Sequence, residues 1–315
     1  MQSIKKLIYV GLGIVLGMWV INSVMPYHWG NFVYSKKLDC INSSNKKYNT
    51  FFFGNSKIFH HLIPAQFDAI TDDPEDVSYN IAIDGGTTFE NQFLIKRFIE
   101  TQQPERIFVT ANLYNPPKES QSLRPVYFWT FGDLKKVWPF LAGHKKEKRL
   151  HLRYYIRNLL KLGAGASIIG KSKSQTDLCI DDGFYALDGL YPEESKLLER
   201  KYPKFVSSLE KAKKRNYKLA FKRKKPSATK DELNARAMAI DLYEFGQDHD
   251  VEIYFVFYPN KKLYFKLDLP NSIYMGDGVE NPHFFDKENW FDKGHLNGRG
   301  AKLFTEILAN AYNDK

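Results

Sequence analysis

The sequence predicts an α/β fold, a three-layer α/β/α domain with a mainly parallel central sheet. From residue 48 onward, short runs rich in β-branched and aromatic residues alternate with longer stretches that carry apolar residues at helical spacing. The succession strand, turn, helix, strand is typical of a parallel sheet with helices on its faces. The strands expected are 48–53, 78–83, 106–110 and 251–258, and the helices are one that begins near 57, then 88–101, 230–247 and 300–312.

Each element rests on its own local pattern. The run Tyr-Asn-Thr-Phe-Phe-Phe at 48–53 is a short apolar segment that ends at a Gly-Asn turn, and 78–83 ends at Asp-Gly-Gly. The helix at 88–101 carries a stripe of phenylalanines with a Leu-Ile pair, and a proline at 104 separates it from the next strand. The last helix has small and apolar residues at core spacing.

The composition is that of a folded globular protein and excludes a disordered or low-complexity chain, because 43% of the residues are hydrophobic and 26% are charged. The net charge of +10 favours contact with polyanions, either nucleic acid, anionic lipid or an acidic envelope polymer. Two basic stretches, 144–162 and 196–225, are either solvated helix faces or a surface for anionic lipid or polymer. Nucleic acid is the weakest of these partners, because an exported domain rarely meets it.

The two cysteines, Cys40 and Cys179, stand far apart and in no C-x-x-C or Cys/His spacing, so we expect no zinc site. Outside the cytoplasm they are able to form one disulfide. The sequence leaves this open because their geometry depends on the fold.

The N-terminus predicts a membrane anchor. Lys5 and Lys6 precede a mostly apolar run, 7–25, which is close to the roughly 20 residues needed to cross a bilayer as a helix. Positive charge before the run places the N-terminus in the cytoplasm and the remainder of the chain across the membrane. A cleaved signal peptide has the same charge pattern, but no convincing small-x-small cleavage site stands near 22–26, so an uncleaved anchor is expected.

This organisation gives three parts. We expect residues 1–26 to be the cytoplasmic stub and transmembrane anchor, 27–46 a linker, and 47–315 one α/β domain. Residues 118–235 are too long for a simple connection, so we expect this insertion to contain helices of its own.

Ser56 is the predicted nucleophile. It follows a hydrophobic strand and a Gly-Asn turn and stands where a helix begins, at the carboxyl end of a parallel sheet, where open α/β folds bind ligands. Backbone N–H groups at such a helix start are able to stabilise an oxyanion. The alternative is an ordinary serine that caps a helix.

Asp292 and His295 supply the remaining groups that a reactive serine needs. A neutral imidazole takes the serine proton, and a carboxylate fixes its tautomer and stabilises the imidazolium that forms. The two residues lie three apart in a tight loop just before the terminal helix. A lone D-x-x-H is common by chance, but this position combined with the N-terminal Gly-x-Ser is far more specific.

Together these residues resemble the SGNH/GDSL hydrolase superfamily, particularly its membrane-anchored members related to D-alanyl and O-acetyl transfer proteins of the bacterial envelope. The resemblance covers the order of motifs over 48–312, and 118–235 contributes nothing to it. The family's first block, Gly-Asp-Ser, is matched by Gly-Asn-Ser at 54–56, and its last block, Asp-x-x-His, by Asp292 and His295. The resemblance implies a flavodoxin-like fold and a Ser-His-Asp triad.

The resemblance also implies an oxyanion hole made by Ser56, Gly85 and Asn112. The second block carries a glycine N–H to Gly85, with Gly86 as a close competitor. Both glycines also suit a turn with positive φ. The third block supplies an asparagine side chain as Gly-x-Asn-Asp; here Asn112 matches while the Gly and Asp are missing, and Asn115 is the fallback.

The function implied is that of a serine esterase or O-acyltransferase, membrane-anchored and extracytoplasmic, which acts on an acylated envelope glycan or polymer with a membrane acyltransferase as a candidate partner. The alternative is a non-catalytic SGNH-like scaffold that binds glycan or lipid and assists such an acyltransferase. We expect no cofactor and no metal. His60 is expected to border the cleft, and the competing pair His283 and Asp286 is interpreted as loop residues.

Overall fold

The computed structural model describes most of the sheet-bearing part of the chain. The described residues are 2–24, 32–71, 75–111, 138, 148–149, 152–153, 156, 178–188, 198–216, 230–259 and 267–315. The chain divides into two compact units. One comprises 36–115 and 177–315 and contains the sheet, and the other comprises 1–35 and 116–176.

Five parallel strands form one sheet in the order β2-β1-β3-β4-β5. The strands are β1 (Thr50–Phe53), β2 (Ser78–Asn80), β3 (Arg106–Thr110), β4 (Glu252–Phe257) and β5 (Ser272–Tyr274). The chain moves from β1 outward to β2 on one side and then returns to β3 on the other. The strand order therefore reverses between β1 and β3, which is the position where open α/β sheets bind ligands.

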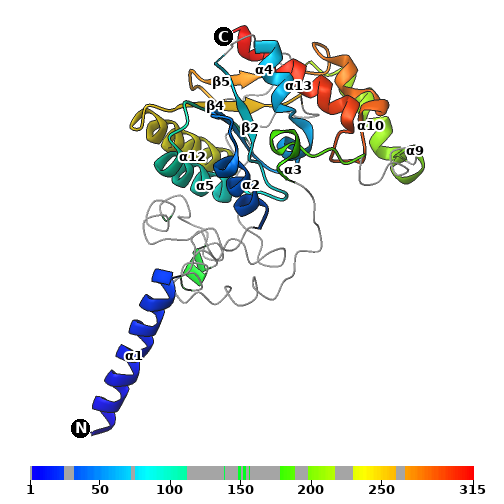
Figure 1. The fold of residues 1–315 in the computed structure, drawn as a ribbon. Coiled ribbons are helices and arrows are strands. Elements are labelled where there is room, and N and C mark those ends of the chain that lie inside the picture. The colour runs from blue at the N-terminus through cyan, green and yellow to red at the C-terminus, as the bar shows by residue number, and fades with distance from the viewer. Residues whose placement is uncertain are drawn as a thin grey trace. The chain divides into compact units, whose positions relative to one another are not determined.

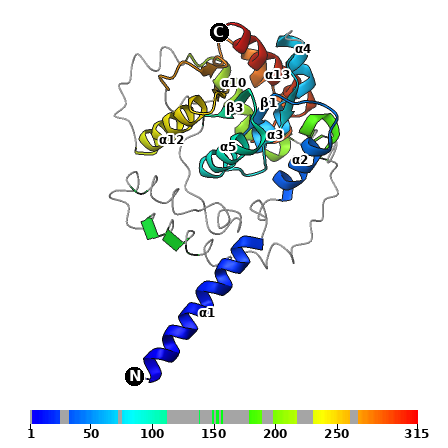
Figure 2. The same cartoon turned by 60° about the vertical axis from the view of Figure 1, so that its left-hand side comes forward.

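Helices pack on both faces of the sheet (Figures 1 and 2). The helices of this unit are α3 (Ser56–His61), α4 (Pro64–Thr71), α5 (Thr88–Gln102), α9 (Leu198–Lys201), α10 (Pro203–Lys213), α12 (Lys230–Gln247) and α13 (Gly298–Asn313), with α2 (Phe32–Ser43) entering it from residue 36. Helix α13 packs against α3 and α4, and α12 packs against α5 and β4. Three short 3-10 helices complete the order, Ile180–Gly183, Pro282–Phe285 and Lys287–Asn289.

Alternation along the strands divides the aromatic core between the two faces. Phe52 and Phe108 stack at 4.9 Å and meet Phe67 of α4, so they point to the face that carries α4 and α13. Phe51 and its neighbour two residues on pack against Phe98 of α5, on the opposite face. Burial of these rings dominates the hydrophobic contribution of the unit to folding.

The α/β class and the mainly parallel sheet expected from the sequence are confirmed. Helices 88–101 and 230–247 were predicted within one residue, and 106–110 is β3 without change. Helix α4 and strand β5 are among the elements that were not predicted. Helix α4 follows α3 after two residues with no Gly or Pro-Gly break, and β5 has only three residues, too few to show a period of two.

The segment expected as a linker, 27–46, contains α2, and residues 36–43 belong to the sheet-bearing unit. Lys37 of α2 is fully buried, and its Nζ donates to the carbonyl oxygens of Asn80, Ala82 and Gly183 at 2.6, 2.9 and 2.9 Å. Burial lowers the pKa of Lys37 well below its usual value, while the negative charge of Asp84 opposes that shift. The Lys37 side chain thus links α2, β2 with the chain after it, and the 3-10 helix at 180–183.

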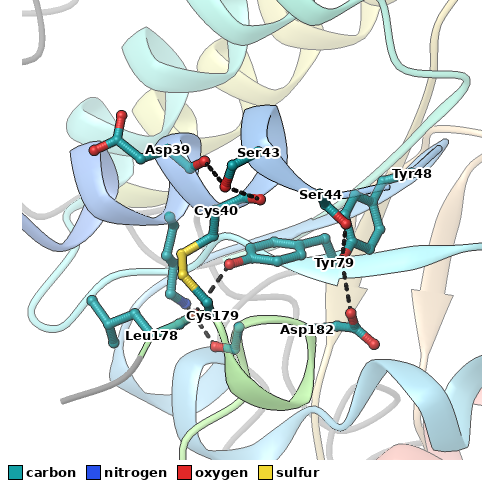
Figure 3. The surroundings of a disulfide bond; sticks show 11 residues. Asp39, Cys40, Ser43, Ser44, Tyr48, Tyr79, Leu178, Cys179 and Asp182 are labelled. Carbon is teal, nitrogen blue, oxygen red and sulfur yellow. Dashed lines mark hydrogen bonds between the residues drawn. A yellow bond between two sulfur atoms is a disulfide. The ribbon is translucent and has the colours of Figure 1, made fainter. Parts of the chain in front are cut away.

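Cys40 of α2 and Cys179 form a disulfide, with their Cα atoms 5.3 Å apart (Figure 3). Beside it the Tyr79 hydroxyl donates to the Leu178 carbonyl at 3.1 Å, and the Tyr48 hydroxyl donates to Asp182 at 2.8 Å. The bond and its neighbours hold residues 178–188 against α2 and the edge strand β2. The question that the sequence left open is thereby answered for this structure.

The N-terminal run lies in helix α1 (Gln2–Val24), whose apolar side chains are exposed where the structure describes them, Leu7 at 79% and Leu12 at 60%. Within the described part of the chain, no helix has both the length and the hydropathy needed to cross a membrane. Of the expected helical insertion 118–235, the structure describes α9, α10, the 3-10 helix at 180–183 and the start of α12; most of its remainder lies outside the described residues.

Candidate active site

Ser56 is the first residue of α3, directly beyond the carboxyl end of β1. Asn55 caps the helix, because its Oδ1 accepts a hydrogen bond from the Lys57 backbone N–H at 3.0 Å. Asn and Asp are both good helix-capping residues, so an aspartate at this position could make the same contact. Gly54 allows the close turn, since a Cβ atom there would lie only 2.6 Å from Cγ1 of Ile58.

Asp292 and His295 are held in one tight turn. The Asp292 Oδ1 accepts backbone N–H groups of Gly294 and His295 at 2.6 and 2.8 Å, and the Phe291 N–H donates to the His295 carbonyl at 2.9 Å. The carboxylate therefore organises the loop and faces the imidazole at once. The short spacing D-x-x-H makes this geometry local, which is why the sequence could predict it.

The three predicted triad residues meet. The His295 Nε2 lies 2.9 Å from the Ser56 Oγ, and the His295 Nδ1 lies 3.1 Å from both carboxylate oxygens of Asp292. With a proton on Nδ1 donated to the carboxylate, Nε2 is left as the acceptor for the serine hydroxyl. Ser56 and His295 are 239 residues apart in sequence, so the fold alone brings them together.

The Asp292 carboxylate is tuned to stay ionised. Its partial burial raises its pKa, but hydrogen bonds from the His295 side chain and from the Gly294 and His295 backbone lower it more, so the net pKa is below the usual value. An ionised carboxylate fixes the Nδ1–H tautomer of His295 and stabilises the imidazolium that forms when the ring takes a proton.

His61 is bonded to the loop that contains Asp292 and His295, a role that the sequence did not predict. The buried His61 Nε2 accepts the Leu296 backbone N–H at 2.9 Å, so the residue after His295 is fixed to α3. Burial, followed by the nearby His295, Lys57 and His60, lowers the pKa of His61 well below its usual value, which keeps the ring neutral and able to accept. Two adjacent histidines were the only signal in the sequence.

His60 lies next to His295. Its ring lies 5.7 Å from that of His295, edge to face, and both of its nitrogens face oxygen atoms, Nδ1 the Tyr185 carbonyl at 2.8 Å and Nε2 the Asp84 carboxylate at 3.2 Å. Asp84 directly precedes the two glycines of the predicted oxyanion hole. His60 thus connects that loop to α3 and to residues 178–188.

The structure describes some of the predicted oxyanion groups and not others. Ser56 lies at the start of α3, and Gly85 has φ of +61°, the left-handed turn that favours glycine. The N–H of the competing Gly86 donates to the Ile83 carbonyl at 3.2 Å. Asn112 and the fallback Asn115 lie outside the described residues.

The competing pair, His283 and Asp286, lies beside Lys213. His283 is 84% exposed at its side chain, and its Nδ1 lies 3.2 Å from Asp286, which is also paired with Lys213 at 2.8 Å. Among the residues that the structure describes, no group of three or more His, Cys, Asp or Glu side chains is placed to hold a metal ion.

The site lies at the carboxyl edge of the sheet, next to the reversal of strand order between β1 and β3. Comparisons of the chain with protein-family models, with curated proteins and with solved structures find no match.

Proposed function

We propose that the protein is a serine acyl-transfer enzyme, an esterase or O-acyltransferase, with Ser56, His295 and Asp292 as its triad. The observation that carries the proposal is the pair of contacts on His295, 2.9 Å from Nε2 to the serine oxygen and 3.1 Å from Nδ1 to the carboxylate. A nucleophile within hydrogen-bond reach of a base that is oriented by a third group is the arrangement that activates a hydroxyl.

The reaction has two balanced steps. In the first, Ser56 Oγ attacks the carbonyl carbon of an ester while His295 Nε2 takes the hydroxyl proton; the tetrahedral intermediate collapses, and the imidazolium returns that proton to the departing alcohol. In the second, water or an acceptor hydroxyl attacks the acyl-serine while His295 Nε2 takes its proton; the bond between the acyl carbon and Ser56 Oγ breaks, and the imidazolium returns the proton to Oγ. Ser56 N–H and Gly85 N–H are the proposed donors to the oxyanion, with Asn112 as the third.

The fold supports a finer assignment to the SGNH hydrolases. The strand order β2-β1-β3-β4-β5, with all strands parallel, is the flavodoxin-like order that this superfamily implies. The nucleophile after the first strand and the Asp-x-x-His before the last helix agree with it. We therefore propose an SGNH-type enzyme.

We further propose that the enzyme works outside the cytoplasm, tethered by its N-terminus with the tail inside. The disulfide between Cys40 and Cys179 supports this, because such bonds persist in oxidising compartments. Helix α1, whose apolar side chains are exposed, is the proposed anchor. An acylated glycan or polymer of the envelope is the proposed substrate, in keeping with the net charge of +10.

A fluorophosphonate probe tests the catalytic proposal. The probe should label the wild-type protein and a Ser43→Ala variant, which loses a hydroxyl that donates to backbone carbonyls of α2, but should not label Ser56→Ala. Absence of labelling in the wild type and both variants would favour the non-catalytic scaffold that assists a membrane acyltransferase. For location, protease added to intact spheroplasts should degrade the part of the chain after α1, whereas complete protection would contradict the orientation.

A further inference from the structure

His60 lies where three segments of the chain meet beside the candidate triad. It follows Ser56 by one turn of α3, so the two side chains leave the same face of the helix. The His60 side chain is 4% exposed, and its ring lies edge to face with that of His295, with the ring centroids 5.7 Å apart. A buried polar ring next to the proposed base must satisfy its own nitrogens.

Both ring nitrogens of His60 face oxygen atoms. Nδ1 lies 2.8 Å from the Tyr185 carbonyl oxygen, and Nε2 lies 3.2 Å from Oδ1 of Asp84. A carbonyl oxygen and an ionised carboxylate accept hydrogen bonds and donate none. A neutral imidazole carries one N–H and therefore satisfies only one of these two oxygens. The complete arrangement fits the imidazolium, which donates from both nitrogens.

The contact with Asp84 reaches the turn that carries a proposed oxyanion donor. Asp84 directly precedes Gly85, which has φ of +61°. A Cβ atom at Gly86 would lie 2.8 Å from the Gly54 carbonyl oxygen, so the turn also touches the chain that leads into α3. A hydrogen bond from His60 to Asp84 therefore ties the helix that begins with the nucleophile to the turn that contains Gly85.

Titratable groups surround His60 on the described segments packed around it. They are Lys37 of α2, Asp84 after β2, Tyr185 of residues 178–188, His295 before α13, and Lys57 and His61 of α3 itself. Of these side chains, the Asp84 carboxylate is the one that Nε2 contacts. Loss of the Nε2 proton would therefore remove a charge-assisted hydrogen bond and leave a nitrogen lone pair facing a carboxylate.

We infer that His60 is a positioning residue that is protonated on both nitrogens in the active protein, and that its contact with Asp84 holds the turn at Gly85 in place for acyl transfer. The inference rests on the proposed function, because the turn matters to the reaction only if Gly85 donates to the oxyanion. When His60 loses its Nε2 proton as pH rises, the turn is released. The rate of acyl transfer then falls on the alkaline side.

A pH series of ester cleavage tests the inference. Values of kcat/KM for p-nitrophenyl acetate, corrected with the Ser56→Ala protein as a blank, are measured from pH of about 5 to about 10. In the wild type they should rise as His295 loses its proton and fall again at higher pH as the contact between His60 and Asp84 is lost.

Three variants separate the contact from the ring itself. His60→Gln places an amide N–H, which does not titrate, where Nε2 stands, so the alkaline fall should disappear. Asp84→Asn should have the same effect, because its amide donates to a neutral Nε2 and accepts from a protonated one. His60→Asn, whose shorter side chain ends before the Nε2 position, should lower kcat by about tenfold or more at every pH.

His283→Gln is the matched control. His283 also faces a carboxylate, that of Asp286 at 3.2 Å, but its side chain is 84% exposed. This variant should keep both limbs of the wild-type profile. Asp84 is 59% exposed at its side chain, so Asp84→Asn provides the same readout if the change at the buried His60 prevents folding.

The two proposals fail differently. A wild type without an alkaline fall, or a fall that persists unchanged in Asp84→Asn and in a folded His60→Gln, would overturn the role of His60 and leave the triad standing. Where p-nitrophenyl acetate is not turned over, the rate of fluorophosphonate labelling at each pH is the readout. A wild type that is neither labelled nor active on the ester would overturn the triad and the role of His60 together.

Discussion

The two faces of the sheet are packed in different ways. On the face of α4 and α13, aromatic rings form a continuous layer, with Phe108 stacked on Tyr254 at 4.9 Å and Tyr312 in contact with both rings. On the face of α5 and α12, phenylalanines fill the space beside β1, but alanines of α12 line a cavity beside β3 and β4.

The two faces also differ in their relation to the candidate active site. The filled face carries α3, α13 and the loop with His295, where the triad needs side chains held to within fractions of an ångström. The open face offers space at the same edge of the sheet. The two faces of the sheet therefore differ in how completely side chains fill the space beside the strands.

The largest expected effect is on the filled face. His295→Ala should lower the rate of ester cleavage by a thousandfold or more, because the Ser56 hydroxyl loses its base. His283→Ala is the matched control, since His283 is exposed and paired only with loop residues in the part of the chain described. Steady-state kinetics on both variants decides, and near-normal turnover in His295→Ala would contradict the mechanism.

A second effect compares the packing of the two faces directly. Phe67 is completely buried among aromatic rings, so Phe67→Ala should lower the free energy of unfolding by about 3–5 kcal/mol. Leu242→Ala should cost less, about 2 kcal/mol, because Leu242 already borders an empty space. Urea unfolding of both variants measures the difference. Equal losses would mean that the faces are equally well packed.

A third effect concerns the buried ammonium on α2. Lys37→Met should lower the free energy of unfolding by about 2–3 kcal/mol, because three carbonyl oxygens lose their donor while the relief of a buried charge offsets part of the loss. Lys36→Met, at the exposed neighbouring position, should stay within about 0.5 kcal/mol of the wild type. Thermal unfolding under non-reducing conditions keeps the disulfide constant. A Lys37→Met variant as stable as the wild type would mean that these hydrogen bonds contribute no more than the burial of the amine costs.

The smallest effect is a pH dependence. The pKa of His61 is lowered in the folded protein, so below pH of about 6.5 the unfolded chain binds a proton that the folded chain does not, and stability falls as pH falls. Between pH 7 and 5 this contributes a loss of up to about 2 kcal/mol. His61→Gln keeps an acceptor for the Leu296 N–H and should show a slope weaker by that amount in denaturant titrations at each pH. An unchanged slope would show that another group titrates.

The sequence by itself determined the elements and motifs that depend on near neighbours. Strand β3 and helix α12 follow from local apolar patterns, and the turn at Asp292 and His295 from a spacing of three residues. Only the tertiary structure decided what depends on distant partners. These are the strand order, the bond between Cys40 and Cys179, which are 139 residues apart, and the hydrogen bond from Leu296 to His61. Each joins segments that are distant in sequence, so no local pattern predicts it. Propensity and capping act over a few residues, whereas burial and close packing act between whatever the chain brings together in space.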